Sequence, residues 1–384
     1  MRISRFSTTL LTIVGLTLSL TAVVGCKGPI TPPKTGETAI APKTTIPPNI
    51  SMAPMAENTL HSLPPLPTLS VATKLPPLGA DPAKISVSGL SSGGFMAVQY
   101  DVAFSASTMG AGVVAGGPYN CFLDNGGRLG NLSDTSRCMS GAPSGDASFA
   151  AANKFANQNL IDDPSNLKSH KIYLFSGTQD NTVKQTVMNA LNEFYVKEGV
   201  PSANIQYLNN VPAGHAFIST HVSNNCGTTM FPYINKCDVG GSLYDQPNAI
   251  LTQIYGHLQP KPGQLSSAPM AFDQKEFKGT GLADTGYVYI PSTCRNGGAT
   301  KCAVHVVFHG CLQDAAIVQD KVYGQVGYNE WADSNNIIVL YPQTALTAPV
   351  MCWDWFGYTG SNFQTKSSPQ ISAVKKMVDR LTSQ

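Results

Sequence analysis

The chain has 384 residues, only 12% of them charged, and its formal net charge is +2. Without Arg2 and Arg5, which fall in the leader described next, basic and acidic residues balance. This balance does not favour nucleic acid or a strongly charged substrate as the partner. The length is ample for one large α/β domain.

The N-terminus has the pattern of an export signal. Two arginines precede an uncharged apolar stretch over residues 10–24, which is too short to favour a membrane-spanning helix. A small residue, Gly25, precedes Cys26, as at a bacterial lipoprotein cleavage site. We therefore predict a signal peptide over 1–25 and a lipid on Cys26 that anchors the protein in a membrane. Ordinary signal cleavage nearby is the alternative.

The next segment is rich in Pro, Thr, Ala and Ser and lacks apolar periodicity. Such a composition cannot bury enough surface to offset the entropy of ordering, so residues 26–80 are predicted to form a disordered tether. Residues 81–384 are predicted to form the catalytic domain. Lys27, directly after Cys26, favours the outer membrane or cell surface as the location.

The most informative motif is Gly-x-Ser-x-Gly at Gly89, Ser91 and Gly93. A β-prone run precedes it and helix-compatible residues follow it. In this context the motif predicts a nucleophile elbow, in which a sharp turn lifts the serine clear of the sheet. The helix N-terminus behind the serine favours developing negative charge.

A serine nucleophile needs a base and a carboxylate that orients the base. Asp180 follows a predicted strand at 171–177, and His215 lies in a glycine-flanked loop after a predicted strand at 205–208. The order Ser, Asp, His is that of the α/β-hydrolases. The alternatives are that Asp180 only forms a turn or caps a helix, and that His221 is the base.

A late apolar strand, 303–308, ends in His309 and Gly310. α/β-hydrolases place their oxyanion loop after such a strand, so the backbone N–H groups of Cys311 and Ser92 are the predicted donors. His309 is expected to contact substrate there. A predicted helix at 325–332 and an apolar strand at 337–341 follow. Because these elements ordinarily precede the serine, we predict a circularly permuted α/β-hydrolase with a mostly parallel central sheet flanked by helices.

Four motifs together resemble the extracellular poly(3-hydroxybutyrate) depolymerases, in particular their single-domain, circularly permuted group. The motifs are residues 89–97, 112–121, 308–313 and 352–358. The resemblance implies a polyester depolymerase that uses Ser91, Asp180 and His215, with Ser92 and Cys311 as the oxyanion hole. It also implies that Trp353 and Trp355 line the substrate crevice, although two tryptophans in such a loop can equally fill a core.

Eight cysteines remain if Cys26 carries lipid, and an exported chain favours disulfides. Eight cysteines allow 105 connectivities. Local spacing favours the pairs Cys121 with Cys138, Cys226 with Cys237, Cys294 with Cys302 and, as the remainder, Cys311 with Cys352. The chain shows no Cys-x-x-Cys or paired-histidine spacing, so neither a metal nor a cofactor is predicted.

The sequence thus predicts an exported, membrane-tethered, monomeric serine esterase. Its expected substrate is short-chain polyhydroxyalkanoate, such as poly-3-hydroxybutyrate, or its oligomers, cleaved through an acyl-enzyme. One alternative is a carboxylesterase for feruloyl or acetyl esters, because the fold does not fix the substrate. A catalytically silent, surface-anchored binding protein is the other.

Overall fold

The computed structural model describes residues 72–384, except 222–223 and 296–300. These residues belong to one compact unit. The predicted signal, the lipidation site Cys26 and most of the predicted tether lie outside the described residues. Within the described part, no helix has the length and apolar character needed to cross a membrane.

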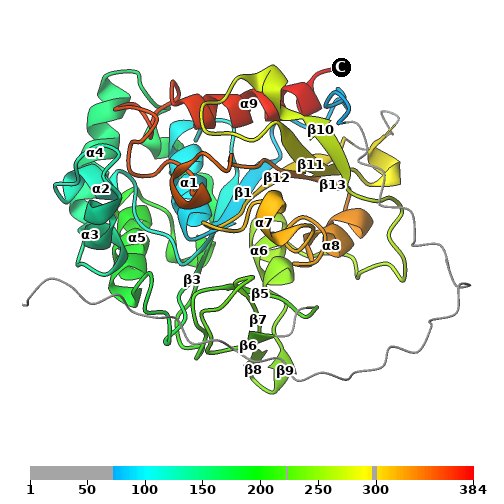
Figure 1. Cartoon of the computed structure of the whole chain (residues 1–384), viewed down its shortest axis with the longest axis horizontal. Helices are drawn as coiled ribbons and strands as arrows, with labels where there is room; N and C mark the ends of the chain where they lie inside the picture. The colour runs from blue at the N-terminus through cyan, green and yellow to red at the C-terminus, as the bar shows by residue number, and fades with distance from the viewer. Residues whose placement is uncertain (1–71, 222–223, 296–300) are drawn as a thin grey trace, which may run out of the picture. The chain divides into compact units, whose positions relative to one another are not determined.

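An eight-stranded sheet forms the centre of this unit (Figure 1). Both pairings of β11 are antiparallel, and the other five pairings are parallel. The central strands are buried and rich in β-branched residues, as parallel strands covered on both faces should be. In spatial order the strands are β10 (Met270–Asp273), β11 (Thr285–Tyr289), β13 (Ile337–Tyr341), β12 (Ala303–Phe308), β1 (Ile85–Leu90), β2 (Gly110–Val114), β3 (Lys171–Phe175) and β4 (Ile205–Leu208).

The order of the strands confirms the circular permutation. The late strand β12 pairs in parallel with β1, the first strand of the domain, and this register places Phe308 opposite Gly89. The predicted strand at 337–341 is β13. The helix predicted at 325–332 begins later, at Tyr328, because Gly327 has a φ of 115° and cannot belong to a helix.

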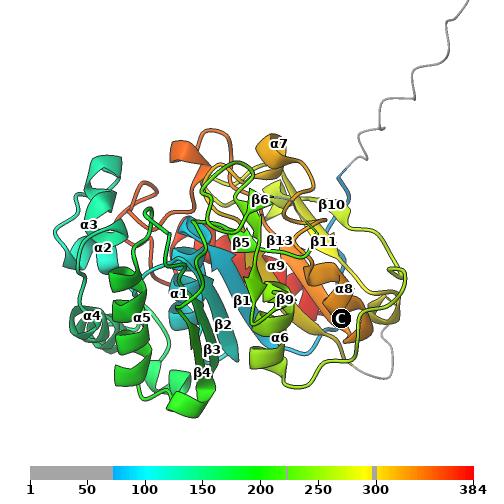
Figure 2. The same cartoon turned by 90° about the horizontal axis from the view of Figure 1, so that it is seen from below.

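Helices cover both faces of the sheet and enclose two hydrophobic cores (Figure 2). One face is covered by α1 and α9 with α4 and α5, and the other by α6 and α8. The apolar stripe of α9, from Ile371 to Leu381, is buried as its spacing requires. The helices are α1 (Ser92–Ala103), α2 (Cys121–Asp124), α3 (Ser136–Met139), α4 (Gly145–Asn157), α5 (Gln185–Lys197), α6 (Gln246–Tyr255), α7 (Ala315–Val318), α8 (Tyr328–Ser334) and α9 (Pro369–Thr382).

A small excursion follows β4 and carries short strands only. It contains a three-stranded sheet and a two-stranded hairpin. Its strands are β5 (Phe217–Ile218), β6 (Asn224–Asn225), β7 (Ile234–Lys236), β8 (Asp238–Val239) and β9 (Ser242–Leu243). All four predicted disulfides are present, and one of them, Cys226–Cys237, closes this excursion.

The predicted start of the domain at residue 81 is too late. Thr73 forms a bridge with Phe272 at the sheet edge, and Leu75 is fully buried. The amides of Gly79 and Ala80 donate to the carbonyls of Ser383 and Leu381, at the end of α9. Composition suggested a tether because prolines stand beside these residues, yet Leu75 and Ala80 complete the core.

Candidate active site

Ser91 sits in the turn between β1 and α1 with φ 56° and ψ −122°. A positive φ is uncommon for a residue with a side chain, and it is the feature that makes a nucleophile elbow sharp. The flanking glycines permit the turn. A Cβ on Gly89 would lie 2.2 Å from the carbonyl oxygen of Gly93, and one on Gly93 would lie 2.3 Å from that of Phe308.

Asp180 and His215 meet at the carboxyl edge of the sheet, after β3 and β4. The Asp180 Oδ2 atom lies 2.7 Å from His215 Nδ1. The Oδ1 atom accepts hydrogen bonds from the amides of Thr182 and Val183, at 2.8 and 2.9 Å. Asp180 therefore also makes the turn that was the alternative interpretation, and this turn fixes the direction of its carboxylate.

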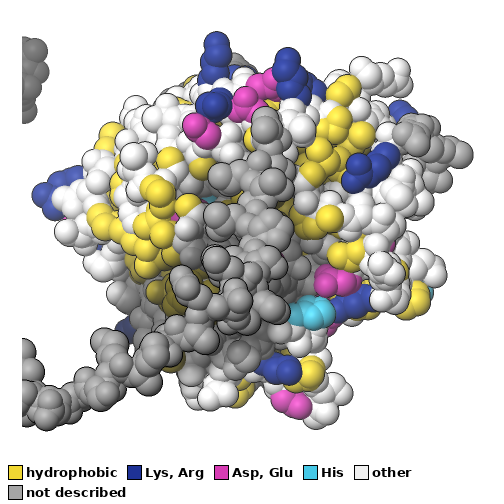
Figure 3. Space-filling view, turned by 45° about the vertical axis from the view of Figure 1, so that its right-hand side comes forward, with side chains coloured by type: hydrophobic (Ala, Val, Ile, Leu, Met, Phe, Trp, Pro, Cys, Tyr) yellow, Lys and Arg dark blue, Asp and Glu magenta, His cyan; other side chains and the backbone are white. Residues whose placement is uncertain are grey.

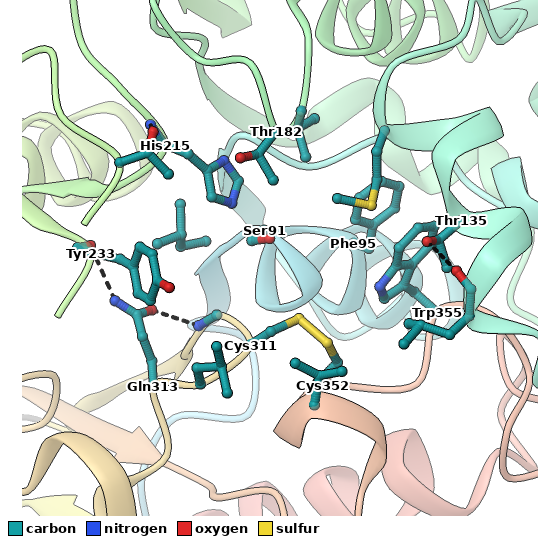
Figure 4. Close-up of a pocket in the computed structure, with 18 residues that line it drawn as sticks. Ser91, Phe95, Thr135, Thr182, His215, Tyr233, Cys311, Gln313, Cys352 and Trp355 are labelled. Carbon is teal, nitrogen blue, oxygen red and sulfur yellow. Dashed lines mark hydrogen bonds between the residues drawn. A yellow bond between two sulfur atoms is a disulfide. The ribbon is translucent and has the colours of Figure 1, made fainter. Parts of the chain in front are cut away.

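The imidazole of His215 points toward Ser91 (Figure 4). Its Nε2 atom makes no hydrogen bond within the described part of the chain, and both residues line one pocket. The backbone amide of His215 donates to Thr229 Oγ1 at 2.9 Å, which holds the loop in place. The competing histidine, His221, is solvent-exposed, lies 3.6 Å from Glu330 and does not line this pocket.

Two backbone amides next to Ser91 are available as donors. Ser92 is the first residue of α1, and the first N–H groups of a helix have no intrahelical acceptor. Among the described residues, the Cys311 amide donates no hydrogen bond. Its loop is held by the Cys311–Cys352 disulfide and by a bond from the Leu312 amide to the Val350 carbonyl at 3.2 Å.

The pocket has a volume of about 300 Å³ and a mostly apolar wall. Trp355 stacks on Phe95 with 4.1 Å between ring centroids, and together they form one side of it. Asp354 orders this loop, because its carboxylate accepts from the amides of Gly357, Tyr358 and Thr359. The rest of the apolar pocket wall is formed by Leu90, Leu132, Met139, Val183, Tyr233, Leu312 and Val350.

Two named proteins are similar to this chain in sequence. A poly(3-hydroxybutyrate) depolymerase of Delftia acidovorans is 43% identical over 323 residues, which are 82% of this chain and 63% of that protein. A polyhydroxybutyrate depolymerase of Talaromyces funiculosus is 37% identical over 331 residues, 81% of this chain and 93% of that protein. The chain belongs to the polyhydroxybutyrate depolymerase family. It thus spans less than two thirds of the bacterial relative and nearly all of the fungal one.

Solved structures of this family share the fold. The crystal structure of a PHB depolymerase from Penicillium funiculosum matches with a TM-score of 0.73 and 36% identity, over 81% of this chain and 99% of that one. A PHB depolymerase complexed with an R3HB trimer matches with the same TM-score and coverage, at 35% identity. No protein-family model matches the chain.

Two residues that the sequence analysis placed at the substrate, Trp353 and His309, do not line the pocket of this chain. Trp353 is fully buried and packs edge-on against Phe308, with 4.9 Å between centroids. The chain bends from Asp354 onward, so Trp355 faces the pocket while Trp353 faces the core. His309 is also fully buried, and both of its ring nitrogens are engaged by the protein.

Sequence reasoning missed most of the pocket wall. Phe95 lies one helical turn after Ser91, and this spacing is a signal that could have identified it. Leu132, Met139, Tyr233 and Val350 come from loops and single helical turns distant in the sequence, where no periodic pattern marks them. Gln313 was also missed, although it lies in the motif that carries the family resemblance.

Proposed function

We propose that the chain is a serine esterase that hydrolyses polyhydroxybutyrate or its oligomers. The observation that carries the proposal is Ser91, held at a strained elbow in an apolar pocket that it shares with the open side of the Asp180–His215 pair. The family relationship supports the substrate class, since a related enzyme was solved with an R3HB trimer.

The geometry fits acyl transfer. Ser91 Oγ attacks the ester carbonyl carbon while His215 Nε2 takes the hydroxyl proton and then gives it to the leaving alkoxide. Asp180 orients the imidazole and stabilises its charged form. The amides of Ser92 and Cys311 donate to the oxyanion. Water, deprotonated by the same histidine, then cleaves the acyl-enzyme and regenerates Ser91.

The surface is suited to a neutral, apolar substrate. Leu132 and Val350, which line the pocket, are also about 40% exposed, so the apolar wall continues to the mouth. On the face shown in Figure 3, hydrophobic side chains form patches between scattered charged side chains. A polyester carries no formal charge along its chain, so the apolar pocket wall favours it over a charged ester.

Replacement of the nucleophile tests the proposal. We expect Ser91→Ala to lower kcat on the order of 10⁶-fold and to leave folding intact, because the glycines form the elbow. A fluorophosphonate probe should label the wild type and not the variant. Turnover close to wild type in Ser91→Ala would reject this site, and labelling of neither protein would favour a silent binding protein.

Substrate choice needs a separate measurement. We expect polyhydroxybutyrate film and soluble hydroxybutyrate oligomers to be hydrolysed, and feruloyl and acetyl esters of polysaccharides to be poor substrates. The reverse preference would make the chain a carboxylesterase of the alternative kind. The ratio of rates on film and oligomer fixes the preferred chain length.

The proposed enzyme is an exported monomer, lipidated at Cys26 and tethered to the outer membrane or cell surface. Its four disulfides support an oxidising compartment. We expect Cys26→Ser to move the protein from the membrane fraction to the soluble fraction and to abolish its labelling by a fatty-acid analogue. Unchanged fractionation would contradict the lipid anchor, and sedimentation of the released protein as a dimer would contradict the monomer.

A further inference from the structure

The peptide group between Gly310 and Cys311 is held from its carbonyl side. The Gly310 oxygen lies 2.7 Å from His309 Nδ1 and accepts from the Gln313 amide at 3.2 Å. The N–H of a trans peptide points opposite to its carbonyl, because the group is planar. Fixing the Gly310 oxygen toward buried His309 therefore fixes the Cys311 N–H in the other direction, away from the core.

The tautomer of His309 follows from its second nitrogen. The Thr344 amide donates to Nε2 at 3.2 Å, while the Thr344 hydroxyl donates to the Met351 carbonyl at 2.8 Å. Nε2 is thus the acceptor, so Nδ1 carries the proton and donates it to Gly310. Burial lowers the pKa of His309 to about 4, which keeps the ring neutral.

Gln313 holds the preceding peptide and connects it to the opposite wall. Its Oε1 atom accepts from the Gly310 amide at 2.7 Å, and its Nε2 atom donates to the carbonyls of Pro232 and Tyr233 at 2.8 and 3.1 Å (Figure 4). The disulfide-closed excursion that holds these carbonyls also supplies Thr229, which fixes the His215 backbone. One buried amide therefore couples the oxyanion loop to the loop of the proposed base.

We propose that His309 and Gln313 are positioning residues that set the plane of the Gly310–Cys311 peptide and so aim the Cys311 N–H at the oxyanion. This inference rests on the proposed function, in which that N–H is a donor. Neither side chain is required to touch the reacting atoms. Both act through the backbone, and their effect belongs to the transition state rather than to substrate binding.

The first test uses a matched pair at His309. His309→Leu removes the donor to Gly310, whereas His309→Asn keeps an N–H near the position of Nδ1. Because loss of a whole oxyanion donor costs about 10²–10³ in kcat, we expect a misaimed donor in His309→Leu to cost roughly 10- to 100-fold. Asn should recover most of this loss.

A second pair at Gln313 separates the two arms of its amide. Gln313→Glu keeps the acceptor for the Gly310 amide but loses the donors to the opposite wall, whereas Gln313→Met loses both. We expect the kcat of Gln313→Met to fall as in His309→Leu, and that of Gln313→Glu to fall less. KM for p-nitrophenyl butyrate should stay within about twofold in all four variants.

The readout must distinguish aim from folding. Rates are expressed per active site, titrated to completion with a fluorophosphonate. A trifluoromethyl ketone, which forms a tetrahedral oxyanion on Ser91, should lose affinity in proportion to kcat, while the matched methyl ketone should not. Unchanged kcat per active site in His309→Leu and Gln313→Met would overturn the positioning roles, and so would equal losses in His309→Leu and His309→Asn. If Ser91→Ala stays active, the proposed function itself fails.

Discussion

Two aspartate–histidine pairs in this domain have nearly the same geometry and opposite surroundings. Asp180 lies 2.7 Å from Nδ1 of His215, and Asp101 lies 2.9 Å from Nδ1 of His170. His215 Nε2 opens on the apolar pocket beside Ser91. His170 Nε2 instead donates to the carbonyl of Ser105 at 3.0 Å, deep between α1 and β3.

An aspartate–histidine pair alone therefore does not make a catalytic site. The surroundings of the second ring nitrogen, Nε2, decide whether the imidazole can accept a proton. An imidazole whose two nitrogens both donate is charged and has no lone pair to accept a proton. Burial alone would lower the pKa of His170, but the charge of Asp101 and the hydrogen bonds that the imidazole donates to Asp101 and Ser105 raise it. His170 is thus a structural cation, whereas His215 keeps one nitrogen open to exchange a proton.

A third histidine, His305, shows the converse case of an imidazole that contacts serine hydroxyls but has no carboxylate partner. His305 lies between the hydroxyls of Ser86 and Ser88, at 2.6 and 2.8 Å, and so has two serine neighbours without a carboxylate. Burial lowers its pKa to about 3, and it is fully enclosed in the sheet. A serine–histidine contact without access to a pocket carries out no hydrolysis, however short it is.

The largest expected difference is between the two histidines. We expect His215→Ala to lower kcat on the order of 10⁶-fold, with little added loss in a Ser91→Ala background, because the triad acts as a unit. His170→Ala should leave kcat per titrated active site unchanged and lower the melting temperature. A severe loss of kcat in His221→Ala with a mild loss in His215→Ala would show that the base has been misassigned.

The carboxylates should differ in the same way. We expect Asp180→Asn to lower kcat by about 10⁴-fold, because an amide no longer selects the productive tautomer of His215. The matched variant Asp101→Asn should keep kcat and lose stability, because it removes the counter-charge of a buried imidazolium. Steady-state kinetics and thermal unfolding of both proteins decide this. Equal losses of kcat would abolish the distinction between the pairs.

The sequence was sufficient to predict the fold, and it also indicated the residues of the proposed triad, because each has a local signal. The glycines at the elbow, the strand before Asp180 and the glycine-flanked loop of His215 all lie within a few residues of the side chain they position. The permutation was also readable, since an oxyanion-type strand followed the histidine in the chain.

Other features depend on tertiary packing, which no local pattern encodes. Whether Trp353 or Trp355 faces the pocket depends on how one loop lies on Phe308 and Phe95. His309 carries the same motif signal whether it faces substrate or Thr344. The role of Asp101 was not visible either, because its partner His170 is 69 residues away and no motif links them.

In the proposed mechanism His215 acts together with the oxyanion loop, so the disulfide that braces this loop should also affect kcat. Cys311→Ala and Cys352→Ala each break the same disulfide and loosen the oxyanion loop, so both should lower kcat alike. The loss is bounded by that of a complete donor, roughly 2.7–4 kcal/mol of transition-state stabilisation. The double variant should be no worse than either single one.

A distant disulfide is the control for this prediction. Cys294–Cys302 braces the start of β12 and does not line the pocket. Its removal by a double alanine substitution should change stability and leave kcat unchanged. Free thiols at Cys311 and Cys352 in peptide maps of the unreduced protein would show that no disulfide braces the oxyanion loop.

The last expected effect concerns stability and not catalysis, and it is a pH dependence of unfolding at the Asp101–His170 pair. The folded pKa of His170 is raised above the ordinary value of about 6.5, so the native state binds more protons than the unfolded state between these two values. Its stabilisation is therefore complete below about pH 6.5 and is lost as the pH rises through the folded pKa. The neighbouring hydroxyl of Tyr195, which donates to Asp101 at 3.1 Å, stays protonated because burial raises its pKa well above 10.

Chemical denaturation across this range isolates the contribution. At pH 6, His170→Leu should cost about 3–5 kcal/mol of unfolding free energy, because it leaves Asp101 buried without its cation. That difference from wild type should shrink as the pH rises, since wild type then loses the same charge. If the difference in unfolding free energy between wild type and His170→Leu stays constant from pH 6 to 9, His170 is not a buried imidazolium. The contrast with His215 would then rest on solvent access alone.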